Sequence, residues 1–192
     1  LEQVTIGSSV TNIGDYAFQY CSHLTEIVIP DNVMYINQYA FEGCTGLTTL
    51  TIPNSVTTIS SSAFEGCTGL TTLIIPNSVT TIGSSAFKGC TSLTSLTVPF
   101  VGYNATTTSS SVSHLGYWFG AQNNSYQNSS VPTSLKTVII TNATRIGSYA
   151  FYGCGNITSI VLNEGITTIG SYAFYGCTGL KQMFFDGTIE QW

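Results

Sequence analysis

The feature of this sequence that most constrains its fold is an internal repeat with a period of 23 residues. An Ala-Phe pair returns at this interval in two runs, at Ala17-Phe18, Ala40-Phe41, Ala63-Phe64 and Ala86-Phe87, then at Ala150-Phe151 and Ala173-Phe174. The cysteines keep the same spacing, at Cys21, Cys44, Cys67, Cys90, Cys154 and Cys177. A fixed period of about 20 to 50 residues is typical of proteins in which each repeat is one structural unit.

The residue pattern within each unit predicts how it folds. A unit reads L-x-x-L-x-I, then a turn that often carries Pro-Asn-Ser, then V-x-x-I-G and A-F-x-G-C. The first segment is too short for a helix and predicts a strand with its second Leu and its Ile pointing inward. V-x-x-I-G predicts a second extended piece, and the residues around Ala-Phe predict one tight helical turn. Because no unit can bury its apolar side alone, the predicted fold is a repeat solenoid of stacked units.

The repeat is interrupted between Cys90 and Cys154, and we interpret this stretch as one degenerate unit with two insertions. The sequence VSHLGYWF, which ends at Phe119, echoes V-x-x-I-G-x-x-A-F with Leu115-Gly116 in the place of Ile-Gly. A strand is expected to follow from Leu135, in the same frame as the strands of the regular units.

The pattern as a whole predicts a single solenoid domain over residues 1–192. Its strands are expected to start at Leu1, Leu24, Leu47, Leu70, Leu93, Leu135, Ile157 and Leu180. The insertions are expected at about 99–111 and 120–134, as loops in the middle of the stack. Because the sequence opens and closes within a repeat, we expect it to be a fragment of a longer chain.

The charge balance argues against two classes of partner. The net charge is −5 at pH 7 with only four Lys and Arg residues, so no nucleic acid partner is expected, because tracking a phosphate backbone needs a basic groove. No apolar run is long enough to span a bilayer, so no membrane insertion is expected for this fragment. Only 7% of residues are charged, against about 25% in a typical soluble domain. Ser, Thr, Asn and Gln supply the polarity instead, which favours an extracellular protein.

The units resemble the BspA-like leucine-rich repeat family, whose consensus is L-x-x-L-x-I-P-x-x-V-x-x-I-G-x-x-A-F-x-x-C. The stretches LGYWFGA, VPTSLKTVIIT and FFDGTIEQW resemble the version found in large surface proteins of gut Gram-positive bacteria. The resemblance implies a right-handed leucine-rich-repeat solenoid of 23-residue units, with short parallel strands and one helical turn per unit. It also implies a bacterial adhesion protein, secreted or attached to the cell wall, that binds host proteins such as fibronectin or fibrinogen. The family has no active-site motif to transfer.

The cysteines are expected to be free, although six cysteines in a secreted chain invite a disulfide framework. All six occupy the same inward position, so neighbouring side chains run in parallel, whereas a disulfide needs facing Cβ atoms about 3.8 Å apart. We therefore predict buried, reduced thiols that act as small hydrophobic side chains. The sequence has no C-x-x-C motif, and His23 and His114 stand at variable positions of different units. No metal or cofactor site is predicted.

No arrangement of side chains indicates catalysis, and the chain is predicted not to be an enzyme. Glu42 and Glu65 hold the same position in adjacent units, about 5 Å apart in a stack, which is close to the spacing of a retaining glycosidase pair. The next unit places Lys88 there, and a solvated edge explains the pattern. No serine stands in G-x-S-x-G, and the sparse His and Asp residues give no triad.

One candidate binding surface is the outward face of the strands. Its rows include five hydroxyl side chains that we single out: Thr49, Thr51, Thr72, Ser95 and Thr97. A flat, weakly polar and uncharged face suits the docking of an extended protein segment. The alternative is that these residues are present as good strand formers, with no ligand to bind.

A second candidate surface is aromatic. Two columns of tyrosines are expected in the C-terminal units, namely Tyr149 with Tyr172 and Tyr152 with Tyr175. Exposed aromatic platforms bind sugar rings or protein anchors, although stacked tyrosines can also simply cover the flank of a solenoid. Tyr117 and Trp118 beside the inserted loops are further candidates, and Trp118 can equally fill the core of an irregular turn.

The sequence leaves three functions open. The first is a cell-surface adhesion scaffold that binds host proteins through the repeat surface. The second is a glycan-binding module that uses the tyrosine patch and the inserted loops. The third is a spacer that has no ligand of its own. None of the three needs a cofactor.

Overall fold

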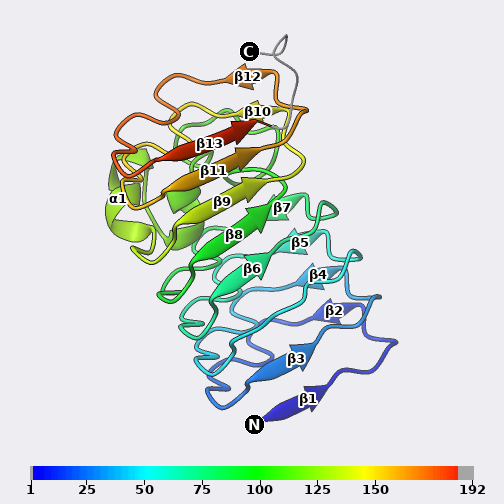
Figure 1. The fold of residues 1–192 in the computed structure, drawn as a ribbon. Helices are drawn as coiled ribbons and strands as arrows, with labels where there is room; N and C mark the ends of the chain where they lie inside the picture. Colours follow the sequence, from blue (N-terminus) through cyan, green and yellow to red (C-terminus); the bar gives the residue numbers. More distant parts are fainter. Residues whose placement is uncertain (1, 186–192) are drawn as a thin grey trace.

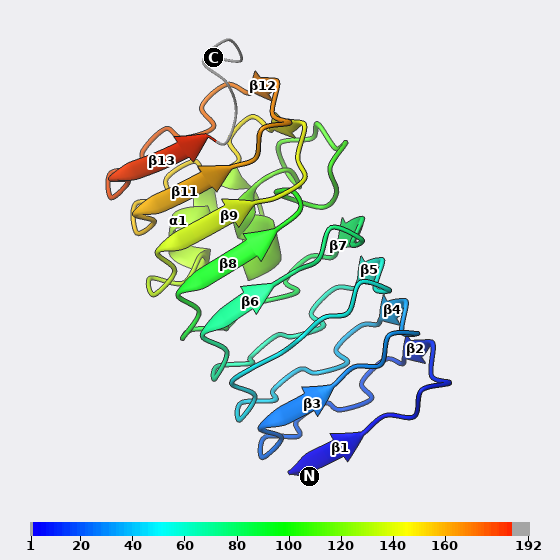
Figure 2. The same ribbon diagram turned by 45° about the vertical axis from the view of Figure 1, so that its right-hand side comes forward.

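Short turns of chain lie one above another along the whole computed structural model, which describes residues 2–185 (Figure 1). Most turns contribute strands to two rows that run along the stack, as the rotated view in Figure 2 also shows. The predicted solenoid of short parallel strands with a spacing of about 23 residues is confirmed. Leu1 and most of the FFDGTIEQW stretch lie outside the described residues.

The first row holds the L-x-x-L-x-I strands, paired in parallel. They are β1 (Gln3–Thr5), β3 (Glu26–Val28), β6 (Thr72–Ile74), β8 (Ser95–Val98), β9 (Thr137–Ile140), β11 (Ser159–Leu162) and β13 (Gln182–Phe185). Between β3 and β6 the row is continued only by isolated bridges through Thr51. Strand β9 pairs directly with β8, with Leu96 opposite Val138. The strand expected from Leu135 therefore does follow the unit of Leu93, and the two inserted segments do not interrupt this row.

The second row holds the V-x-x-I-G segments and is broken in the middle. Its strands are β2 (Asn12–Ile13), β4 (Tyr35–Ile36), β5 (Thr58–Ile59), β7 (Thr81–Ile82), β10 (Arg145–Ile146) and β12 (Thr168–Ile169). The first four form one sheet and the last two form another. Between them the central unit contributes no strand, and the backbone N–H of Ile82 donates instead to the carbonyl of Tyr103 at 3.0 Å.

The segment around Ala-Phe is a series of hydrogen-bonded turns and not a turn of regular helix. In one unit the amide of Glu65 donates to the carbonyl of Ser62 at 3.1 Å, and the amide of Phe64 donates across the stack to Ala86 at 2.8 Å. The residue before each Ala has a positive φ between 56° and 62°, at Tyr16, Tyr39, Ser62, Ser85, Tyr149 and Tyr172. One left-handed residue per turn interrupts helical geometry, so the expected helical turn takes this irregular form.

Within residues 2–185, helices occur only in the central unit and its second insertion. They are the 3-10 helices η1 (Leu115–Phe119) and η2 (Asn124–Tyr126) and the short α1 (Gln127–Ser130). The interpretation of Leu115-Gly116 as the Ile-Gly part of an extended segment is wrong, because both residues lie in η1. The amide of Leu115 donates to the carbonyl of Ala150 at 2.8 Å. The physical reason is that Tyr103, from the first insertion, already occupies the place beside β7.

A buried glutamine joins the central unit to the next one. Gln127 is fully buried, its Oε1 accepts from the amide of Gly116 at 3.2 Å, and its Nε2 donates to the carbonyl of Tyr149 at 2.8 Å. A backbone bond, from the amide of Leu115 to the carbonyl of Ala150, joins the same two units. The second insertion thus adds a side-chain link to the backbone link between them.

The core is a continuous column in which each repeat position stacks on its equivalents. The phenylalanines of the first four units stack with ring centroids 5.2–5.9 Å apart. The cysteines are free, as predicted, and most donate to a carbonyl of the preceding unit, as Cys67 Sγ does to Phe41 at 3.2 Å. Burial raises the pKa of the Cys44 thiol to about 11, with a smaller contribution from Cys21. The prediction of burial holds for four of the six cysteines, whereas Cys21 and Cys177 at the ends of the stack are only partly buried. With its raised pKa, the Cys44 thiol remains protonated at neutral pH.

Candidate functional site

The outward side chains of the first row form two ladders. The first, which we name the hydroxyl ladder, pairs Thr72, Ser95, Thr137 and Ser159 across successive strands. The second, which we name the apolar ladder, consists of Val28, Thr51, Ile74, Thr97, Ile139, Val161 and Phe184. Neighbouring rungs lie about 4.8 Å apart, the spacing of paired strands. All the side chains of these two ladders are uncharged.

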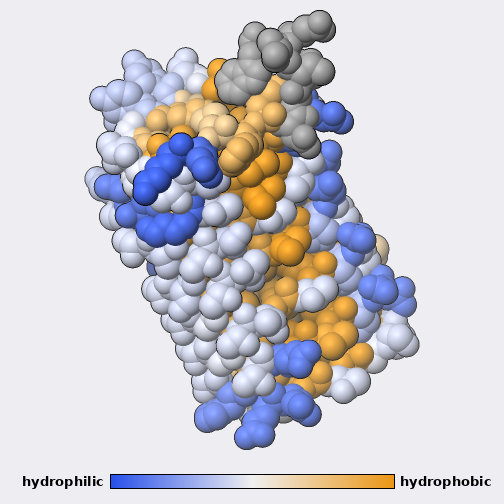
Figure 3. Space-filling model, viewed as in Figure 1, coloured by the Kyte–Doolittle hydropathy of each residue, from blue (hydrophilic) through white to orange (hydrophobic). Residues whose placement is uncertain are grey.

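The apolar ladder is open to solvent at several rungs. Val28 is 68% exposed, Ile74 59% and Phe184 53%. Figure 3 shows an apolar band that follows this face of the stack, with weakly polar surface beside it. An apolar patch that extends over many repeats is unusual on a soluble protein and indicates an interaction surface.

The five hydroxyl residues predicted for this face lie on or beside the ladders. Thr51 and Thr97 are rungs of the apolar ladder, and Thr72 and Ser95 are rungs of the hydroxyl ladder. Thr49 faces outward near Glu26. These two residues and Thr51 line a hollow of about 290 Å³. Sequence reasoning did not single out Val28 or Phe184, although each shares a repeat position with Thr51.

The tyrosines of the C-terminal units form a cluster on the turn segments. Tyr149 stacks on Tyr172 with centroids 5.3 Å apart, Tyr152 stacks on Tyr175 at 5.3 Å, and Tyr172 meets Tyr175 edge to face at 5.8 Å. Tyr172 and Tyr175 are exposed. The cluster belongs to the segments that follow β10 and β12, so the structure does not bring it together with the ladders.

Trp118 is not available to a ligand. Its side chain is fully buried, its Nε1 donates to the carbonyl of Gly102 at 2.9 Å, and its ring packs edge to face against Phe87. It fills the core of the irregular unit, and we leave it out of the proposed site. Tyr117 is half-buried, with its ring against those of Tyr103 and His114.

The two carboxylates compared above with a glycosidase pair each bind a side chain of another unit. Glu65 forms an ion pair with Lys88 at 2.7 Å, and Glu42 accepts from Gln19 Nε2 at 2.6 Å, as expected of a solvated edge. Within residues 2–185 no group of three or more His, Cys, Asp and Glu side chains lies close enough to share a metal ion. Over the same range no helix has the length and apolar character needed to cross a membrane.

A buried histidine makes the stability of the central unit depend on pH. Burial lowers the pKa of His114, and the bond from its Nε2 to the carbonyl of Ser111 opposes this shift. The folded state therefore binds fewer protons than the unfolded state below about pH 6.5, and stability falls as the pH is lowered. We expect a loss of about 1 kcal/mol of unfolding free energy between about pH 7 and pH 5.5, measured by urea unfolding.

The control for this pH dependence is a matched pair of variants. His114→Gln removes the ionisable group and should abolish the loss, while His23→Gln, at an exposed position, should keep it. A loss that persists in full in His114→Gln would contradict the assignment.

The family follows from the repeats. The chain matches the BspA type leucine rich repeat region in six copies, over residues 1–113 and 122–192. The chain belongs to this family. BspA-type arrays are repeat scaffolds suited to protein interaction, and their solenoid fold is typically non-catalytic. No curated protein matches the chain.

Two solved structures share the fold of this BspA-type array. The leucine rich repeat protein TpLRR of T. pallidum is 23% identical with a TM-score of 0.53, and the match covers 93% of this chain and 78% of that one. The pneumococcal vaccine antigen PcpA is 21% identical with a TM-score of 0.60, and the match covers 97% of this chain and 41% of that one. The chain thus spans less than half the length of PcpA.

Proposed function

We propose that residues 1–192 act as one adhesion scaffold, secreted or attached to the cell surface, that binds an extended segment of another protein along the apolar ladder. The observation that carries the proposal is the exposure of Val28, Ile74 and Phe184 on one face within a single uninterrupted ladder. The family supports a surface location, and PcpA, a vaccine antigen, has the same fold. Host matrix proteins such as fibronectin and fibrinogen are the partners to test first.

The test is binding of the chain to immobilised fibronectin and fibrinogen at low and high salt. Because the ladders carry no charge, binding should survive high salt. The double variant Ile74→Ala with Ile139→Ala should weaken binding about tenfold or more, since truncation of a buried interface anchor costs over about 1 kcal/mol. The matched control is Tyr172→Ala with Tyr175→Ala, which changes a different face and should bind as the parent does. Equal losses in both double variants would contradict a ladder site.

The tyrosine cluster supports a second candidate function, glycan binding. Its exposed rings, Tyr172 and Tyr175, offer the aromatic faces on which sugar rings pack. If the tyrosine cluster binds glycans, Tyr172→Ala with Tyr175→Ala should lose binding to a glycan panel. The isoleucine double variant should retain it. If neither matrix proteins nor glycans bind, the chain is a spacer, and both binding functions are rejected.

A further inference from the structure

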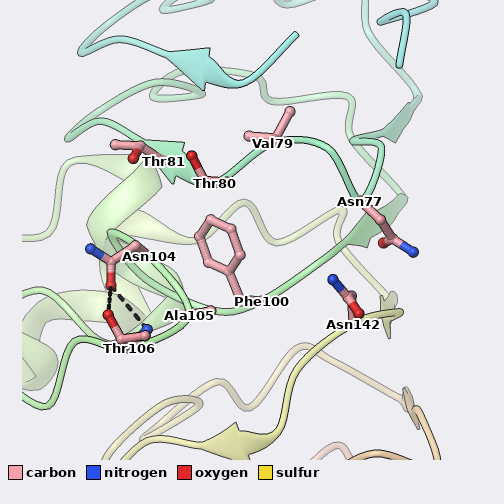
Figure 4. A pocket seen from close by; sticks show the side chains of 9 residues that line it. All are labelled: Asn77, Val79, Thr80, Thr81, Phe100, Asn104, Ala105, Thr106 and Asn142. Atoms are coloured by element: carbon pink, nitrogen blue, oxygen red, sulfur yellow. Dashed lines mark hydrogen bonds between the residues drawn. The ribbon is translucent and has the colours of Figure 1, made fainter. Parts of the chain in front are cut away.

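A pocket lies beside the break in the second row of strands, where the central unit contributes no strand. Its volume is about 380 Å³, within the range of about 300–1,000 Å³ that is typical of small-molecule sites. Figure 4 shows that its side chains come from three segments: residues 77–81 of a regular unit, residues 100–106 at the first insertion, and Asn142 of the following unit.

The pocket exists because the following unit does not stack on residues 77–81. On the other side, this layer rests on the preceding unit, with the amide of Thr80 donating to the carbonyl of Thr57 at 2.8 Å. Above it the chain turns away at Phe100 into the insertion. The next unit then closes over the gap, where Thr141 Oγ1 donates to Asn77 Oδ1 at 2.6 Å and the amide of Asn142 donates to the carbonyl of Pro99 at 3.2 Å.

Polar groups in this pocket keep hydrogen-bonding capacity, and two of them, the carboxamides of Asn77 and Asn104, are held in place. Asn104 Oδ1 accepts from the amides of Thr106 and Thr107 at 3.0 and 2.8 Å, which fixes the carboxamide. Within residues 2–185, no hydrogen bond engages the Nδ2 groups of Asn77 and Asn104, the carboxamide of Asn142 or the hydroxyl of Thr81. The site therefore offers donors and acceptors from all three segments.

The lining is uncharged and contains one aromatic ring. Phe100 is 3% exposed and is held by an edge contact to Trp118 with centroids 6.4 Å apart. A charged ligand would find no counter-charge here. A sugar ring fits this chemistry, because it is uncharged and its hydroxyl groups both donate and accept. We propose that this pocket binds a neutral saccharide unit, independently of the apolar ladder and of the tyrosine cluster.

The test is a titration of the chain with glucose, galactose and N-acetylglucosamine, followed by proton–nitrogen correlation spectra. At least one sugar should shift the side-chain amide signals of Asn104 and Asn142. Thr81→Val should weaken binding about two- to tenfold, as expected for the loss of one neutral hydrogen bond. Thr58→Val is the matched control, since Thr58 pairs with Thr81 across β5 and β7 but lies outside the pocket, and it should not change the affinity.

Three outcomes would overturn the proposal. They are signals of Asn104 and Asn142 that none of the three sugars shifts, an equal loss in Thr58→Val and Thr81→Val, and sugar-induced shifts confined to Tyr172 and Tyr175. The isoleucine double variant keeps this pocket intact, so it should bind sugar as the parent chain does even if it loses a protein partner.

Discussion

Replacement of Trp118 by alanine is expected to lower the free energy of unfolding by about 3–5 kcal/mol, because a large buried ring is removed and leaves a cavity. The side chain is fully buried and meets Phe87 and Phe100 edge to face. Its Nε1 also satisfies the carbonyl of Gly102. Urea unfolding followed by circular dichroism measures the loss.

Trp118→Phe separates the two contributions. It keeps most of the apolar volume but leaves the buried carbonyl of Gly102 without its donor, so the expected loss is smaller, about 1–3 kcal/mol. A loss below about 1 kcal/mol for Trp118→Ala would show that the ring does not fill the core of the central unit and would reopen its role at the surface.

Replacement of Gln127 by leucine is expected to cost about 1–3 kcal/mol, because a buried amide loses its partner and a carbonyl keeps only its bond from the amide of Tyr152, while the volume is kept. These groups are the amide of Gly116 and the carbonyl of Tyr149. The damage should be local to the contact between the central unit and the next one, since each repeat contacts only its neighbours. Hydrogen exchange should therefore rise first around this contact, and urea unfolding gives the total loss.

The matched control makes the same substitution in the same inserted segment. Gln122 is exposed, so Gln122→Leu should change stability by less than about 0.5 kcal/mol. Equal losses for the two variants would contradict the bridging role of Gln127.

Much of the fold was predictable because the period alone decides which residues face inward. Once Phe41 and Phe64 are known to share a repeat position, parallel stacking places their rings in contact, as the structure confirms. The prediction was incomplete where the period stops. Nothing in the pattern of the polar segment 120–134 distinguishes Gln127 from its exposed neighbours, because its role depends on two backbone groups outside this segment. The position of Leu115 was wrong because Tyr103, within the first insertion, takes the place beside β7 that the repeat pattern assigns to Leu115.

The candidate sites also differ in whether the sequence could predict them. The outward rows follow from alternation along a strand, so the repeat itself places Thr72 opposite Ser95, and the pairing of β6 with β8 agrees. The pocket beside the second row could not be predicted, because its walls come from segments that lie up to 65 positions apart in the sequence, from Asn77 to Asn142. Its existence depends on how the insertion leaves the stack, which no local pattern encodes.

The parallel pairing of the first row has a consequence for the kind of sequence that the apolar ladder can recognise. Rungs recur about every 4.8 Å, whereas same-side residues of an extended peptide recur about every 6.7 Å. A peptide that lies along the stack therefore drifts out of phase with the rungs within a few residues, and no fixed motif can place a side chain on every rung. Such a surface selects overall apolar character and length, so it tolerates sequence variation in its partner and loses affinity gradually as the partner is shortened.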